Sequence, residues 1–217
     1  MKFRFLFTVS FLCVSLSFSQ NTKNVDARGN NSDEEKLNLH ESLCFYTTQQ
    51  ISRKGVINYL KTESLMVDEF TTPIRGRLVD FSLIRIRDEF LLEVSIQEDA
   101  EEPIYPVCIG NDASLKLHLN NGQQVVLPQF GEKRCGSRNV ESNTYYNVTN
   151  QGFFLISPEN LNKLRKSEVN LAEFSAKSYT FNFVFRSELY DEVNDIMIYP
   201  EYYFMSELEC VINPILD

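Results

Sequence analysis

The sequence lacks tryptophan, has only two histidines, and offers no apolar run long enough to span a membrane as a helix. Its most apolar stretch, Phe5–Phe18, is fourteen residues long and contains several hydroxyl side chains. A helix that crosses a bilayer needs about 20 mostly apolar residues, so we expect no permanent anchor. The missing tryptophan excludes little, because 17 Phe and 10 Tyr supply rings for a core.

Signatures of several enzyme classes are also absent. The chain contains no G-x-S-x-G, H-E-x-x-H, Walker or G-x-G-x-x-G motif, and no C-x-x-C pair of the kind that binds zinc. Histidine, the usual general base, occurs only at His40 and His118. His118 lies between two leucines, so we expect it on the solvent side of its strand. These absences argue against an enzyme, and we assign no catalytic residue.

Clusters of positive charge are missing too. The formal net charge is −9, and removal of Lys2 and Arg4 with a leader would make it −11. Phosphate backbones are bound by clustered lysine and arginine side chains that release counterions. Nucleic acid and an anionic membrane surface are therefore poor candidate partners.

The first residues have the pattern of a secretory signal peptide. Lys2 and Arg4 precede the short apolar run, and small residues follow near Ser19. We predict a signal peptide over residues 1–20, cleaved near Ser19 or Gln20. Cys13 follows two large apolar residues, which does not fit a lipid-attachment signal. Residues 21–39 are polar and predict a flexible tail, and residues 40–217 a single β-rich domain.

A leader that ends in Phe-Ser-Gln-Asn precedes a body rich in Asn, Lys, Phe, Tyr and Ile. In both respects the chain resembles exported proteins of Bacteroidetes-type bacteria. The resemblance covers the leader and the general composition, and it includes no catalytic motif. It implies a periplasmic or extracellular location and carries no activity with it.

An even number of cysteines remains after the predicted cleavage, which in an exported protein suggests disulfides with three possible connectivities. The four are Cys44, Cys108, Cys135 and Cys210. We favour a Cys108–Cys135 pair because the two bracket a predicted hairpin, and a Cys44–Cys210 pair that ties the ends of the domain together. Buried free thiols remain an alternative. So does a reactive Cys135, whose pKa the neighbouring Lys133 and Arg134 would lower.

Period-two patterns predict most of the secondary structure. Residues 76–86 and 88–97 read as an antiparallel hairpin with a tight turn at Asp88-Glu89 and a β-bulge near Ile84. Residues 114–128 predict a hairpin whose Asn121-Gly122 forms a type I′ turn. Residues 144–156 predict two further strands separated by a turn at 150–152. Residues 179–186 predict a strand with an aromatic inner face.

Three segments predict short helices. Ser157 and Pro158 suit a helix start, and Phe204, Leu208 and Val211 share one face of a C-terminal helix ended by Pro214. Residues 187–197 predict a third helix with an acidic stripe made of Glu188, Asp191, Glu192 and Asp195. The expected fold class is mainly β (α+β), with antiparallel, sandwich-like sheets, about eight to ten strands and two or three short helices.

An acidic run follows one of the predicted strands: Glu98, Asp99, Glu101 and Glu102. Four carboxylates could hold Ca²⁺, which takes six to eight oxygen ligands, or supply the paired acids of a glycosidase. The run has no glycine, and catalytic acids normally come from separate elements. We favour a solvated turn whose like charges discourage sheet pairing.

Aromatic residues are the last candidate site: Tyr145, Tyr146, Phe153, Phe154, Tyr199, Tyr202, Tyr203 and Phe204. Most should belong to the core, but exposed rings would suit sugars or a docking partner. The leading hypothesis is an exported, non-catalytic domain that binds or assembles with a protein or glycan outside the cytoplasm. The alternatives are an envelope or extracellular hydrolase and a calcium-stabilised structural module.

Overall fold

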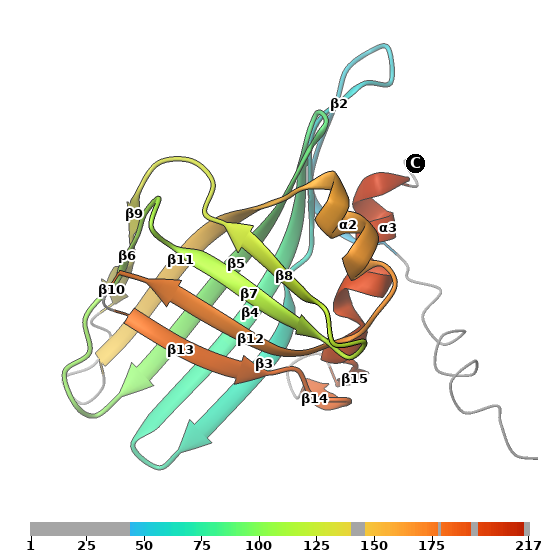
Figure 1. The fold of residues 1–217 in the computed structure, drawn as a ribbon. Coiled ribbons are helices and arrows are strands. Elements are labelled where there is room, and N and C mark those ends of the chain that lie inside the picture. The colour runs from blue at the N-terminus through green and yellow to red at the C-terminus, as the bar shows by residue number, and fades with distance from the viewer. Residues whose placement is uncertain (1–43, 140–145, 178, 192–194, 215–217) are drawn as a thin grey trace, which may run out of the picture.

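The structure is a computed structural model that describes residues 44–139, 146–177, 179–191 and 195–214. Two antiparallel sheets lie face to face, which confirms the predicted mainly β, sandwich-like class (Figure 1). The predicted leader and tail lie outside the described residues. Among the described residues, no helix combines the length and apolar character needed to cross a membrane.

The larger sheet has seven strands and curls into a half-barrel (Figure 1). Its hydrogen-bonded order is β1-β2-β4-β5-β11-β10, and β3 pairs with β4 beyond the end of β2. The strands are β1 (Tyr46–Ile51), β2 (Ile57–Thr62), β3 (Leu65–Thr72), β4 (Arg75–Ile86), β5 (Glu89–Ala100), β10 (Ser137–Asn139) and β11 (Tyr146–Ile156).

The smaller sheet crosses in front of the half-barrel (Figure 1), with the order β13-β12-β7-β8. Its strands are β7 (Ser114–Leu119), β8 (Gln124–Pro128), β12 (Val169–Ala176) and β13 (Tyr179–Val184). Two small antiparallel pairs complete the fold: β6 (Cys108–Ile109) with β9 (Arg134–Cys135), and β14 (Leu189–Asp191) with β15 (Ile196–Ile198). Five of the fifteen strands in the described residues have only two or three residues, and such strands escape detection by alternation.

One hydrophobic cluster fills the space between the sheets. Phe81 of β4 lies at its centre, with ring centroids 5.9 Å from Phe183 of the facing sheet and 5.6 Å from Tyr203. All three side chains are buried. Burial of one such side chain contributes about 1.5–3 kcal/mol.

Two of the predicted helices are confirmed. Helix α2 (Pro158–Leu164) begins at Ser157, whose hydroxyl accepts the amide of Asn160. A 3₁₀ turn, η1 (Pro200–Tyr202), leads into α3 (Tyr203–Ile212). The expected face of α3 is buried and covers one end of the half-barrel, where Arg85 of β4 donates hydrogen bonds to the carbonyls of Val211 and Ile212.

The third predicted helix is wrong. Within this segment, Leu189–Asp191 form β14, and Ile196 and Met197 belong to β15, so that Leu189 lies opposite Ile198. Those two side chains are buried, whereas Ile196 and Met197 of the expected helix face are each 47% exposed. Asp195 has a positive φ of 56°, which interrupts helical geometry. Glu188, Asp191 and Asp195 therefore share no helix face, and Glu192 lies outside the described residues.

The predicted β4–β5 hairpin is confirmed, but its turn is Arg87-Asp88, with Ile86 opposite Glu89. The expected β-bulge near Ile84 is also wrong, because the register is unbroken from Arg75 to Ile86. The alternation changes there because Ile84 and its partner Leu91 are both buried on the outer face of the half-barrel. Both faces of strand β4 are therefore buried near Ile84.

The β7–β8 hairpin is confirmed with a different turn. Gly122 donates its amide to the Leu119 carbonyl at 2.9 Å, and Leu119 donates to Gln123 at 2.9 Å. Gly122 has a φ of +81° and Asn121 does not have a positive φ. This is a three-residue loop with glycine in the left-handed position, where a type I′ turn would require positive φ at both residues.

The predicted turn at residues 150–152 is also wrong, because strand β11 runs through these residues without interruption. Asn150 is buried and accepts the amide of Val107 at 2.7 Å. A side chain at Gly152 would come within 3.1 Å of Ile109. The two turn-forming residues mark places where another segment approaches the strand closely.

Candidate functional site at the open end of the half-barrel

The end of the half-barrel away from α3 carries charged and aromatic side chains in place of a purely apolar core. We call this region the open end. Arg85 contacts α3 near one end of β4, whereas Arg75 and Arg77 lie at the other end of the same strand. The open end consists of Asp68, Phe70, Arg75, Arg77, Glu98, Tyr179 and Phe181. These residues come from β3, β4, β5 and β13, so both sheets contribute.

Glu98 joins the two sheets at the open end. Its carboxylate accepts a hydrogen bond from Arg75 Nη2 at 2.6 Å and another from the Tyr179 hydroxyl at 2.9 Å. Glu98 is 5% exposed, so a buried charge is neutralised by one cation and one hydroxyl. Burial, reinforced by the Glu98 charge, raises the pKa of Tyr179 well above its usual value. Tyr179 therefore remains a donor at all ordinary pH values.

Arg77 forms a second fixed group. Its Nη2 atom lies 3.1 Å from Asp68 Oδ2, and its guanidinium lies 4.8 Å from the Phe181 ring centroid and 5.8 Å from that of Phe70. An arginine held between two rings and a buried carboxylate gains cation–π and ion-pair energy together. Phe70 remains 47% exposed, so this pair of rings faces solvent in part.

A hollow of about 1000 Å³ opens beside these residues and shares Tyr179 with them. Its walls come from the segment around β6, the loop before β9 and the β12–β13 turn. The lining includes Tyr105, Asn111, Asp112, Lys133, Lys177 and Tyr179. Tyr105 is 72% exposed. The volume of this open hollow lies at the upper end of the range of ligand sites, and its lining combines two tyrosine rings with polar groups.

The wall of the hollow is held in place covalently and by packing. Cys108 and Cys135 lie opposite each other in the β6–β9 pair and form a disulfide. Gly136 donates its amide to the Val107 carbonyl at 2.9 Å, and a side chain at Gly136 would overlap Asn150 of β11. The wall is thus fastened to the half-barrel before any ligand arrives.

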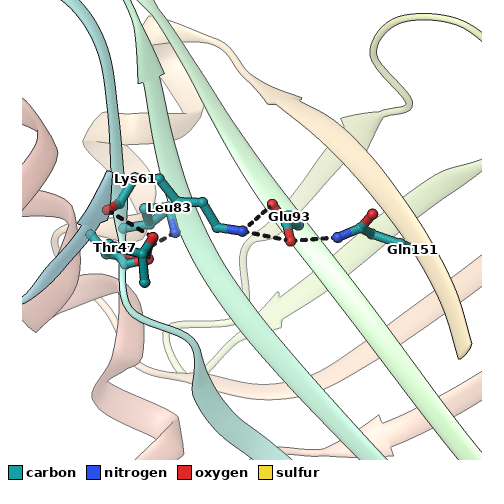
Figure 2. A network of polar contacts seen from close by, with 6 residues as sticks. Thr47, Lys61, Leu83, Glu93 and Gln151 are labelled. Carbon is teal, nitrogen blue, oxygen red and sulfur yellow. Dashed lines mark hydrogen bonds and ion pairs between the residues drawn. The ribbon is translucent and has the colours of Figure 1, made fainter. Parts of the chain in front are cut away.

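A second polar group lies on the outer face of the half-barrel and is shown in Figure 2. Lys61 Nζ lies 2.9 Å from the Glu93 carboxylate, to which Gln151 donates at 2.6 Å. Glu93 is 7% exposed. The three side chains link β2, β5 and β11.

The four acidic residues of the predicted calcium candidate do not converge. Strand β5 continues to Ala100, so the run is only partly a turn. Glu98 points to the inner face and is buried, Asp99 points to the outer face, and Glu101 and Glu102 follow as exposed residues. Within the described ranges, no three His, Cys, Asp or Glu side chains gather where they could hold a metal ion.

Both cysteine pairs are the favoured ones, Cys44 with Cys210 and Cys108 with Cys135. Cys135 is therefore a disulfide partner in this structure. His118 lies on the solvent side of its strand, with Nε2 2.8 Å from Glu173 Oε1. Hydrogen bonds from Lys116 and His118 lower the pKa of Glu173. His40 lies outside the described residues.

The aromatic candidates divide between the core and half-buried positions. Phe154, Tyr203 and Phe204 are buried, while Tyr146, Phe153, Tyr199 and Tyr202 are half-buried; Tyr145 lies outside the described residues. The rings at the open end were not among the sequence candidates. The alternation of residues 179–186 indicated an aromatic inner face, but it could not show that Tyr179 and Phe181 reach the end of the core.

No protein-family model, curated protein or solved structure matches the chain.

Proposed function

We propose that the protein is an exported, non-catalytic domain that binds a glycan outside the cytoplasm in the hollow beside the open end. The observation that carries this proposal is the hollow of about 1000 Å³ whose walls are fixed in advance by the Tyr179–Glu98 hydrogen bond and the Cys108–Cys135 disulfide. A rigid site loses little conformational freedom when it binds.

The residues that line the hollow favour a glycan ligand over a protein partner, whose interface would have a more apolar centre. Tyr105 presents an exposed ring on which a sugar face can stack, and Asn111, Asp112, Lys133 and Lys177 supply hydrogen-bonding groups around it. Protein interfaces are depleted of lysine and aspartate at their centres. A protein partner is the second outcome that the experiment below distinguishes.

Binding fits the open end better than hydrolysis does. A glycosidase needs one carboxylic acid with a raised pKa and a second carboxylate facing it across the substrate. In the described part of the open end, Glu98 is committed to Arg75 and Tyr179, and Asp68 to Arg77. The hollow's described lining also includes no histidine. These pairings supply structure and leave neither Glu98 nor Asp68 available as an acid–base pair.

Co-sedimentation of the purified protein with insoluble envelope material tests the proposal. Protease-treated envelopes retain glycans and periodate-treated envelopes retain proteins, so the two treatments separate the two partner classes. We expect binding to survive protease and to fall about five- to thirtyfold in Tyr105→Ala and Lys133→Glu variants, because each removes a contact worth about 1–2 kcal/mol. Val126→Lys, on exposed strand β8, is the matched control.

Binding that all three variants retain equally would overturn the assignment to the open end, and binding lost to protease alone would point to a protein partner. Export is tested separately by N-terminal sequencing of the protein from cell fractions. We expect a start near residue 20 or 21 in the periplasmic or extracellular fraction. Two disulfides are compatible with an oxidising compartment.

A further inference from the structure

Strand β13 forms one edge of the smaller sheet, and its outward backbone groups have no partner in the described residues. Phe185 donates its amide to the Asn170 carbonyl at 3.1 Å, which fixes the phase of the β12–β13 ladder. Backbone groups in an antiparallel pair alternate between the partner strand and the opposite edge. Phe181 and Phe183 therefore bond β12, whereas Thr180, Asn182 and Val184 direct N–H and C=O outward.

This edge also lacks the features that normally prevent strands from pairing with other chains. Such features are charged side chains, proline, β-bulges, short length and a covering segment. Strand β13 has six residues with the sequence Tyr-Thr-Phe-Asn-Phe-Val, a regular register and no charge. Thr180 and Asn182 are exposed, and Val184 is 56% exposed.

The other long edges among the described residues are protected. Strand β8 ends in Pro128, and the Asn160 side chain of α2 caps its Val126 carbonyl at 3.1 Å. Strand β3 has a register shift, and Arg186 donates to the Glu69 carbonyl at its edge. Strand β1 has two register shifts. Among the long edges in the described residues, β13 alone lacks a feature that would prevent another strand from pairing with it.

We propose that two copies of the chain pair through β13 about a two-fold axis at Asn182. In this register Asn182 lies opposite Asn182 of the partner subunit, and Thr180 lies opposite the partner's Val184. Only registers with even residue sums place the inner faces of both copies on the same side. The register centred on Asn182 pairs every outward N–H and C=O group of residues 180–184, and it forms about six hydrogen bonds between the two copies.

The strand is complementary to itself in chemistry as well as in register. Because it has no charged residue, no like charges face each other across the axis. The β-branched pair Thr180 and Val184 becomes a cross-strand contact, a type that contributes about 0.2–1 kcal/mol. Phe181 lies opposite the partner's Phe183, so the aromatic inner face continues through the axis. The two smaller sheets become one continuous sheet of eight strands.

Sedimentation velocity from about 1 to about 200 μM protein tests this pairing. We expect the wild type to convert from monomer to dimer within that range. Asn182→Lys and Asn182→Glu each place two like charges opposite each other and should raise Kd at least about fivefold. An equimolar mixture of the two variants should restore the dimer as a heterodimer. Val126→Lys, on the capped edge of the same sheet, should dimerise like the wild type.

Amide hydrogen exchange followed by NMR gives a second readout. The amides of Thr180, Asn182 and Val184 should become protected as concentration rises, while those of Phe181 and Phe183 are protected at every concentration. If the wild type stays monomeric at about 200 μM, the proposal is wrong, and the β13 edge would instead pair with a strand of another polypeptide. A dimer that both Asn182 variants retain, or that their mixture fails to restore, overturns the β13 register.

Discussion

Tyr179 donates its hydroxyl hydrogen to Glu98 across the two sheets, over 2.9 Å, at the point where the hydrophobic core ends. The same carboxylate accepts Arg75 from its own sheet. The buried carboxylate of Glu98 thus holds the smaller sheet against the half-barrel. The open end keeps its shape through this contact.

Replacement of Tyr179 by phenylalanine removes that contact and leaves the ring. We expect the free energy of unfolding to fall by about 1–2 kcal/mol, because the buried Glu98 loses one of its donors. Urea denaturation measures the change. Tyr105→Phe, whose ring is 72% exposed, is the control and should change stability by less than about 0.5 kcal/mol. Equal effects of the two substitutions would contradict the role given to Tyr179.

The position of Arg77 between two rings makes it sensitive to conservative substitution. Arg77→Lys keeps the charge beside Asp68 but loses the planar group that lies over Phe181 and Phe70. We expect a loss of about 1 kcal/mol. Arg165→Lys, in an exposed pair with Glu209, should be close to neutral. Thermal unfolding of both variants compares them, and a neutral Arg77→Lys would mean that the stacking contributes nothing.

Glu207 on α3 predicts a pH dependence of stability. Burial raises its pKa to about 7 from 4.5, so the folded state holds a proton that the unfolded state releases between these values. The unfolding free energy should therefore decrease as pH rises from about 4.5 to about 7, by on the order of 2–3 kcal/mol.

Glu207→Gln should remove that decrease and raise the stability at pH 8. Urea unfolding at about pH 5 and about pH 8 measures the slope. Glu209→Gln, on the same helix but 46% exposed at its side chain, should leave the slope nearly unchanged. The assignment fails if the Glu207→Gln variant shows the same pH dependence as the wild type.

The two disulfides close loops of very different length, with sequence separations of 166 and 27. On the chain-entropy account, removal of Cys44–Cys210 should cost about 5 kcal/mol and removal of Cys108–Cys135 about 3.5 kcal/mol. Denaturation of the two double-alanine variants tests this order. Cys135 is exposed and Cys210 is fully buried, so limited reduction followed by alkylation and mass spectrometry should label the 108–135 pair first.

Calcium should not stabilise the fold through the acidic run. Glu98 and Asp99 point to opposite faces of β5, so the carboxylates cannot share one ion with its six to eight oxygen ligands. We expect the same Tm in millimolar calcium and in a chelator, measured by differential scanning calorimetry. A calcium-dependent rise of several degrees in Tm would instead support the hypothesis of a calcium-stabilised module.

Local patterns were sufficient for much of the fold. The alternation in β5, the glycine of the β7–β8 loop and the Ser157-Pro158 start of α2 each depend on a few neighbouring residues, and each element formed where it was expected. Asn150 and Gly152 were misread as a turn because their roles depend on the segment around Val107 and Ile109, far away in sequence.

The open end could not be derived because it depends on register. A β4–β5 turn at Asp88-Glu89 would have placed Arg77 opposite Ala100, whereas the actual turn at Arg87-Asp88 places it opposite Glu98. A shift of one residue at the turn moves every cross-strand partner by two. The ion pairs at the far end of the hairpin therefore depend on a detail that alternation alone does not define.

The C-terminal helix has a consequence for how the chain reaches its final form. Tyr203 packs on Phe81, Arg85 caps the last turn of α3, and Cys210 is bonded to Cys44. A nascent chain that ends before residue 203 has nothing to cover this side of Phe81. Closure of this end therefore requires residues 203–212, so the β-strands by themselves leave the core exposed there.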